Sequence, residues 1–130
     1  MSKLKKIIKE ALIHPYRVCK PNQTQVKRLF KLINHEIFDD ELEEFGKIII
    51  TKLDAQTLGT CDAIELVDSQ RHCNLRIRKK YDNLFVFLET LIHEMVHSYH
   101  WLCEMRENLS HGKAFTRWQN KILKNWKIKI

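Results

Sequence analysis

The chain has few residues that bend or break the backbone, with only 3 glycines and 2 prolines among 130 residues. This scarcity argues against a disordered chain and against an all-β fold rich in turns. The cysteines, Cys19, Cys61, Cys73 and Cys103, form no Cys-x-x-Cys pair, which excludes a zinc ribbon and a thioredoxin-type redox motif. No apolar run is long enough to span a membrane, and charges interrupt the N-terminal residues where a signal peptide would be apolar. We therefore expect an intracellular, cytoplasmic protein with reduced cysteines and no membrane partner.

Charge is the strongest feature of the composition. Lysine and arginine number 23 against 16 acidic residues, which gives a net charge of +7. Such an excess favours an anionic partner, nucleic acid before a membrane surface, and the alternative is a charge that serves solubility alone. The length fits one globular chain able to bury roughly two-thirds of its unfolded surface. Within it we separate a basic amphipathic N-terminal helix or arm, residues 1–20, from a domain of residues 21–130.

The spacing of apolar residues predicts an α+β fold. Apolar residues recur every three or four positions in four segments, and they alternate or form β-branched runs in three others. Asn22 or Thr24 can cap the second helix, and Asp82 or Asn83 can cap the third. The predicted order is N-terminal helices at 3–13 and 23–38, a small three-stranded antiparallel sheet from 47–53, 58–64 and 73–78, a long helix to about Met105, and a C-terminal helix from about His111 to Asn125.

The long helix carries His93-Glu94-Met95-Val96-His97, a His-Glu-x-x-His motif. Two histidines four positions apart lie one turn apart on one helix face, so their imidazoles can hold one zinc ion. The glutamate beside the first histidine can reach a water at that ion and take its proton. On a helical wheel these histidines and His100 fall opposite the core stripe, which weighs against buried structural histidines. The stripe consists of Leu84, Leu88, Leu91, Ile92, Met95, Tyr99 and Leu102.

A catalytic zinc site needs a third protein ligand and one open position. His100 is unsuitable, because in a straight helix it lies about 10 Å from His93 along the axis. No glycine or proline follows His97 to bend the helix, so the third ligand must come from another segment. His111 is the best placed, since it follows a loop that can turn the chain back and precedes Gly112. The residues alone also leave His72, His35 and His14 as candidates.

Residues 90–99, together with His111-Gly112-Lys113-Ala114-Phe115, resemble the SprT-like zinc metalloprotease domain family of the Spartan type. That family combines a His-Glu-x-x-His helix with a third zinc-binding histidine in a downstream His-Gly-x-x-Phe motif. Upstream, the similarity extends to residues 29–34, 38–42, 58–61 and 73–77, and it covers roughly residues 22–125. It implies a zincin-like domain with one Zn²⁺ ion held by His93, His97 and His111, and with Glu94 as the catalytic base.

The resemblance also implies a zinc-dependent endopeptidase that acts on protein substrates. Spartan-type relatives cleave proteins bound or crosslinked to DNA, which is a role in DNA repair. Two groups of basic residues suit sequence-independent contacts with phosphates, and a solvated face is the alternative for each. The first group is Arg71, Arg76, Arg78, Lys79 and Lys80, and the second is Lys113, Arg117, Lys121 and Lys124.

A competing hypothesis is a non-enzymatic DNA-binding or regulatory module whose zinc only stabilises the fold. Glu94 argues against it, because a structural site needs no general base and usually closes with a fourth protein ligand. In either case we expect a monomer. His100 is expected to be a solvent-exposed helical residue, with a place in the cleft wall as the alternative. Cys61 and Cys73 are expected to be small buried residues on neighbouring strands, with a metal or redox role as the alternative.

Overall fold

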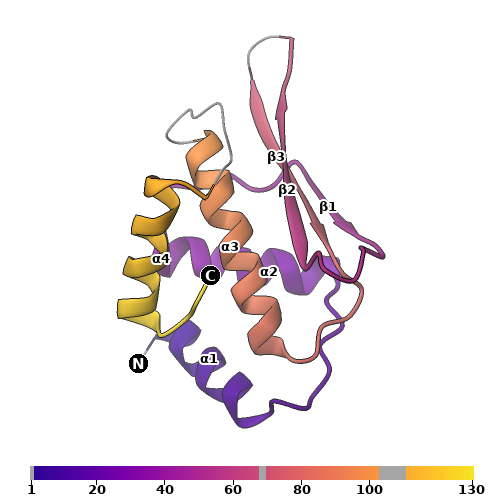
Figure 1. The fold of residues 1–130 in the computed structure, drawn as a ribbon, viewed down its shortest axis with the longest axis vertical. Helices are drawn as coiled ribbons and strands as arrows, with labels where there is room; N and C mark the ends of the chain where they lie inside the picture. Colours follow the sequence, from indigo (N-terminus) through magenta and orange to yellow (C-terminus); the bar gives the residue numbers. More distant parts are fainter. Residues whose placement is uncertain (1, 68–69, 103–110) are drawn as a thin grey trace.

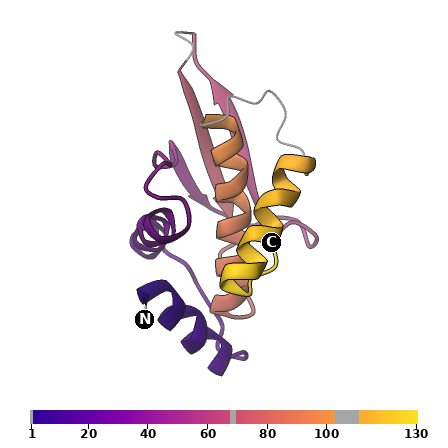
Figure 2. The same ribbon diagram turned by 90° about the vertical axis from the view of Figure 1, so that its left-hand side faces the viewer.

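The computed structural model describes residues 2–67, 70–102 and 111–130. The predicted α+β class is confirmed, because the described residues combine helices with a three-stranded sheet. Figure 1 shows the helix α3 crossing the middle of the molecule, and Figure 2 shows it between α2 and α4. In chain order the elements are α1 (Lys3–Ile13), α2 (Gln23–Ile37), β1 (Lys47–Ile50), β2 (Gly59–Glu65), β3 (Arg71–Ile77), α3 (Leu84–Leu102) and α4 (Lys113–Trp126).

The second and third helices begin where a side-chain oxygen can accept from their free N–H groups. Asn22 Oδ1 accepts a hydrogen bond of 2.8 Å from a main-chain N–H in the first turn of α2. Asn83 Oδ1 accepts one of 2.9 Å in the first turn of α3. Of the predicted alternatives, these two asparagines are therefore the caps. The first helix, α1, ends at Ile13 as predicted, since the residue before Pro15 avoids the helical conformation.

The sheet is mixed, so the prediction of a purely antiparallel sheet was wrong. The strand β3 lies between the other two, parallel to β1 and antiparallel to β2, with Ile50 opposite Ile77 and Cys61 opposite Leu75. The prediction assumed strands joined by short loops, which suit antiparallel neighbours. The connection between β1 and β2 instead leaves room for β3, which is the strand with one fully buried face. On that face Cys73, Leu75 and Ile77 are all 0% exposed.

The hydrophobic core is formed by the sheet and by residues of α1, α2, α3 and α4, the last contributing Phe115 and Ile122. The inner face of the sheet packs on α3, while α1 and α4 contact that helix elsewhere on its surface. Because neighbours cover α3 on nearly every side, its buried surface is wider than the predicted stripe. Phe87, Val96 and Trp101 are buried in addition to the stripe residues Leu88 and Met95.

One predicted helix boundary differs from the structure, and another lies outside the described residues. The last helix begins at Lys113, two positions after the predicted start at His111. The predicted end of the long helix near Met105 lies outside the described residues, as does Cys103. Among the helices of the described part of the chain, none combines the length and the apolar character needed to cross a membrane.

Candidate metal centre

The helix α3 places the two histidines of the motif side by side at its surface toward α4. The ring centroids of His93 and His97 lie 5.0 Å apart, as expected for residues one helical turn apart. His93 is half-buried, whereas His97 is only 6% exposed. The position of both rings is fixed by a helix that is itself packed on most sides, so the pair is held in place before any ligand binds.

His111, directly before α4, completes the group. Its Nε2 atom lies 3.0 Å from Nε2 of His97 and 3.1 Å from Nε2 of His93. The ligand atoms of the three residues lie within 4.8 Å of one another, which is close enough to hold one metal ion. Among the described residues, no other set of three or more histidine, cysteine or acidic side chains converges in this way. Three imidazoles without a fourth protein ligand are the donor set of an open, catalytic type of zinc site.

The other histidines considered for the third ligand lie outside this group. His35 Nδ1 lies 2.9 Å from Oδ2 of Asp40, and His14 Nε2 lies 3.1 Å from Oε1 of Glu10. His72 belongs to β3. The structure therefore brings His111 together with the two motif histidines, whereas His14, His35 and His72 lie outside the group.

The C-terminal segment, residues 127–130, contacts His93 from the side opposite to His111. Lys127 adopts a left-handed φ of 59° after α4, and the chain then turns back toward the middle of α3 (Figure 1). Ile128 is 0% exposed and anchors the segment. The main-chain oxygen of Ile130 lies 2.7 Å from Nδ1 of His93. Because that oxygen can only accept, Nδ1 carries the hydrogen, and the lone pair of Nε2 faces the other two histidines.

Phe115 packs against all three histidines and is only 1% exposed. Its ring centroid lies 4.8 Å from that of His93, and 4.7 Å from those of His97 and His111. The His-Gly-x-x-Phe spacing brings this ring onto the same side of α4 as His111, about one helical turn away. An apolar ring in this place restricts the rotation of the imidazoles and excludes water from one side of the group.

Burial changes the ionisation of the motif residues. It lowers the pKa of His93, with a smaller contribution from nearby His111. It lowers the pKa of His97 to about 3, helped by the neighbouring histidines. Both imidazoles are therefore neutral at physiological pH, which is the form that binds a metal ion. For Glu94, burial raises the pKa to about 7, with a smaller effect of the negative charge of Asp62.

A cavity of about 310 Å³ opens beside the motif and is lined by both His93 and Glu94. Its walls come from the start of β2, the first half of α3 and the C-terminal segment. Gly59 lets β2 pass close over α3, since a Cβ atom there would lie 2.9 Å from Cγ2 of Thr90 and 3.2 Å from the carbonyl oxygen of Arg76. A carboxyl group whose pKa lies near neutrality thus faces a cavity next to the imidazole group.

The structure corrects the expectation for His100, which is buried at 2% exposure. The prediction treated the side of α3 opposite the core stripe as solvated. The helix α4 covers that side instead, and its Phe115 ring lies 6.3 Å from the His100 ring. His100 is not among the residues that line the cavity at the motif.

The cysteines and the basic groups can also be placed. Cys61 and Cys73 lie on paired strands as expected, but only Cys73 is fully buried, whereas Cys61 is half-buried; both are free thiols. In the first basic group, Arg71 donates to the carbonyl oxygen of Trp101 at 3.2 Å. Arg78 donates to three carbonyl oxygens of the segment between β1 and β2. These two guanidinium groups stabilise the fold, whereas Lys79, Lys80 and all four residues of the second group are exposed.

Comparison with known proteins identifies one family. The sequence profile of the SprT-like family matches residues 26–130, from the first turn of α2 to the C-terminal segment. The matched range contains the motif on α3, His111 and Phe115, while α1 lies outside it. No curated protein and no solved structure gave a significant match. Because the match extends over most of the chain, this protein belongs to the SprT-like family.

Proposed function

We propose that this protein is a zinc-dependent endopeptidase in which His93, His97 and His111 hold the ion and Glu94 is the general base. One observation carries the proposal: a buried carboxyl with a pKa near 7 lies at a cavity beside three convergent imidazoles. A site that only stabilised the fold would have no use for such a carboxyl group. Family membership supports the same conclusion, because metalloprotease-like activity is generally associated with SprT-like domains.

The chemistry divides between the ion and the chain. When bound, Zn²⁺ supplies Lewis acidity toward the scissile carbonyl and the attacking water. Glu94 accepts a proton from that water and later delivers it to the leaving amine, a role that suits a carboxyl group whose pKa lies near the working pH. His93 is oriented by the main-chain oxygen of Ile130, so its Nε2 is ready to coordinate. The cavity between β2 and the C-terminal segment receives the substrate chain.

We further propose that the protein substrate is bound or crosslinked to DNA. The support is electrostatic: Lys113, Arg117, Lys121 and Lys124 are exposed on α4, whose first turn follows His111 directly. Contacts of these side chains with phosphates would be independent of sequence and sensitive to salt. Reversing the charges of Lys121 and Lys124 should therefore flatten the salt dependence of DNA binding, and an unchanged dependence would argue against this surface.

The decisive experiment compares wild type with Glu94→Gln. Both proteins should contain one zinc ion, while cleavage of a DNA-binding protein should fall by about 10²- to 10⁴-fold in the variant. Assays with and without single-stranded DNA test the role of DNA. Glu43→Gln is the control for the loss of one negative charge, since Glu43 is exposed and does not line the cavity. If both proteins hold zinc and wild type cleaves nothing, including itself, the non-enzymatic module becomes the better account.

A further inference from the structure

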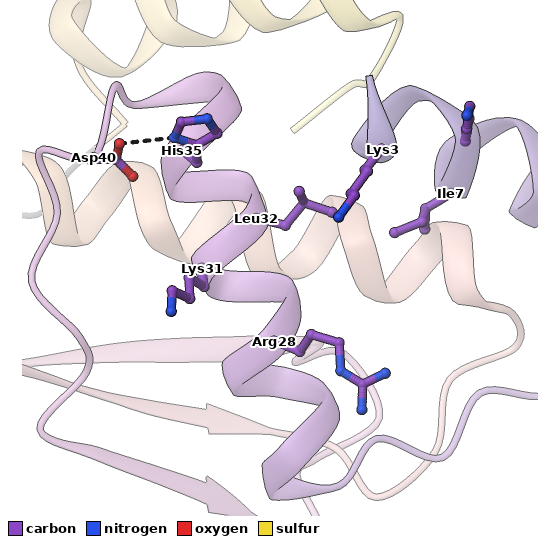
Figure 3. Close-up of a pocket in the computed structure, with 8 residues that line it drawn as sticks. Lys3, Ile7, Arg28, Lys31, Leu32, His35 and Asp40 are labelled. Carbon is purple, nitrogen blue, oxygen red and sulfur yellow. Dashed lines mark hydrogen bonds and ion pairs between the residues drawn. The ribbon is translucent and has the colours of Figure 1, made fainter. Parts of the chain in front are cut away.

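A second cavity, of about 620 Å³, lies between α1 and α2, away from the metal centre. Its apolar floor comes from Ile7 on α1 and Leu32 on α2. Figure 3 shows Leu32 and Lys3 reaching into the space between the two helices from opposite sides. We call this cavity the α1–α2 groove. The SprT-like match begins inside α2, so one wall of the groove belongs to a helix outside the matched range.

The two helices that form the groove are held in place by a hydrogen bond between them and by buried side chains of α1. The main-chain N–H of Leu4 donates a hydrogen bond of 2.9 Å to Oε2 of Glu36, which joins the start of α1 to the end of α2. Leu4 and Ile8 of α1 are buried at 0% and 7% exposure, so the apolar face of α1 is already used to dock the helix. The groove is therefore a preformed depression between two docked helices, and it does not need α1 to leave its place.

The apolar floor is surrounded by positively charged side chains that have no acidic partner among the described residues. Four cations line the groove, and none of them makes an ion pair or a side-chain hydrogen bond with any other described residue: Lys3, Lys6, Arg28 and Lys31. The only acidic side chain in the lining, Asp40, lies 2.9 Å from Nδ1 of His35 (Figure 3). That contact raises the pKa of His35, so the carboxylate of Asp40 interacts mainly with this imidazole. The groove thus presents unpaired cations around an aliphatic floor.

From this combination we infer that the α1–α2 groove binds an acidic peptide segment of a partner protein, anchored by one or two large aliphatic side chains. Carboxylates complement the four cations, and aliphatic side chains cover Ile7 and Leu32. A single-stranded nucleic acid fits less well, because no tryptophan, tyrosine or phenylalanine lines the groove for its bases to stack on. A second copy of this chain also fits less well. Its acidic segment 39–44 has its apolar residues, Leu42 and the following Phe45, buried in its own core.

The test uses the 130-residue chain and a fluorescein-labelled synthetic peptide of glutamates and aspartates with leucine at every third or fourth position. Binding is measured by fluorescence anisotropy. The groove variant is Lys6→Glu/Lys31→Glu, and the matched control is Lys9→Glu/Lys27→Glu. The control changes the same charge on the same helices at exposed positions outside the lining. We expect binding to weaken by at least about tenfold in the groove variant and by less than about twofold in the control.

A second peptide separates the apolar contribution from bulk charge. It has the same acidic residues but serine in place of every leucine, and it should bind at least about tenfold more weakly than the first. The proposal fails if the two peptides bind equally, if both double variants lose binding equally, or if the leucine peptide does not bind at millimolar concentration. The proposal also fails if binding of the leucine peptide does not depend on Lys6 and Lys31, while binding of single-stranded DNA, binding of anionic vesicles or self-association does.

Discussion

Nδ1 of His93 and the main-chain oxygen of Ile130 lie 2.7 Å apart, although 37 positions separate the two residues in sequence. The contact fixes which imidazole nitrogen faces His111, and it joins the last residues of the chain to the metal centre. The same segment lines the cavity through Lys129 and Ile130. This short segment thus has two structural effects: it orients the imidazole of His93 and forms one wall of the cavity beside Glu94.

Removing Lys129 and Ile130 should weaken zinc binding by about 10- to 100-fold, the usual cost of losing a partner that orients a metal-binding histidine. Ile128, the buried anchor, stays in this variant, so the fold should be retained. Competition with a chromophoric chelator measures the affinity, and circular dichroism checks the fold. Lys129→Ala keeps the main chain and should bind zinc as wild type does. Equal affinities of the proteins with and without Lys129 and Ile130 would show that the contact with Ile130 has no role in metal binding.

His111→Ala should lower zinc affinity at least about 100-fold, because two imidazoles on one helix leave the ion with too few protein ligands. His72→Ala is the matched control, since His72 was a candidate on sequence grounds but lies on β3, outside the imidazole group. Zinc content after dialysis, measured by mass spectrometry, distinguishes the two. Stoichiometric zinc in the His111 variant, or its loss in the His72 variant, would reassign the third ligand.

The parts of the fold that depend on local chemistry were predictable from the sequence. Asparagines at 22 and 83 cap helices through their own side chains, and Pro15 ends the first helix, so each signal lies within a few residues of its effect. The alternation of Cys73, Leu75 and Ile77 likewise gave the buried face of β3. The three histidines that lie close enough to bind a metal were also singled out, two of them by helical spacing and the third by family resemblance.

Features set by distant contacts could not be predicted in this way. Nothing within β1 indicates that its partner is β3, because the order of strands is decided by which strand best fills the centre of the sheet. His100 was misjudged because a helical wheel shows the periodicity of one helix and not the helix that covers it. The contact of Ile130 with His93 was missed for the same reason, since a main-chain oxygen has no signature in sequence.

Gly59→Ala should destabilise the protein by about 1–3 kcal/mol, the usual cost of overpacking. The added Cβ would lie 2.9 Å from Cγ2 of Thr90, so β2 must move away from α3 next to Glu94. Thr90→Ser removes that methyl group and keeps the hydroxyl that donates to the carbonyl oxygen of Val86. Urea unfolding of the two single variants and the double variant forms a cycle. The double variant should recover part of the loss, and strictly additive effects would contradict the predicted contact.

The metal-free protein should show a pH-dependent gain in stability on Glu94→Gln. Burial raises the pKa of Glu94 to about 7 from an ordinary value of 4.5, so between these values the folded state binds more protons than the unfolded state. The free energy of unfolding of wild type therefore falls as pH rises through this range. Above pH 7 the full loss of stability caused by ionising the buried carboxyl group is present. Glutamine carries no charge, so the variant should be more stable by about 2–3 kcal/mol at pH 8 and by almost nothing near pH 4.5.

The difference between the two proteins isolates Glu94 from His97, whose effect has the opposite sign. The pKa of His97 is lowered to about 3, so the stability that depends on its neutral form is lost as pH falls below about 6.5. Both proteins share this loss, and it cancels in the comparison. Urea unfolding in the presence of a chelator, at intervals between pH 4.5 and 8, gives the curve. Glu43→Gln, at an exposed position, controls for the removal of one negative charge. A difference that stays constant across this range would mean that the carboxyl group of Glu94 titrates as it does in water and is not poised to act as a base near neutral pH.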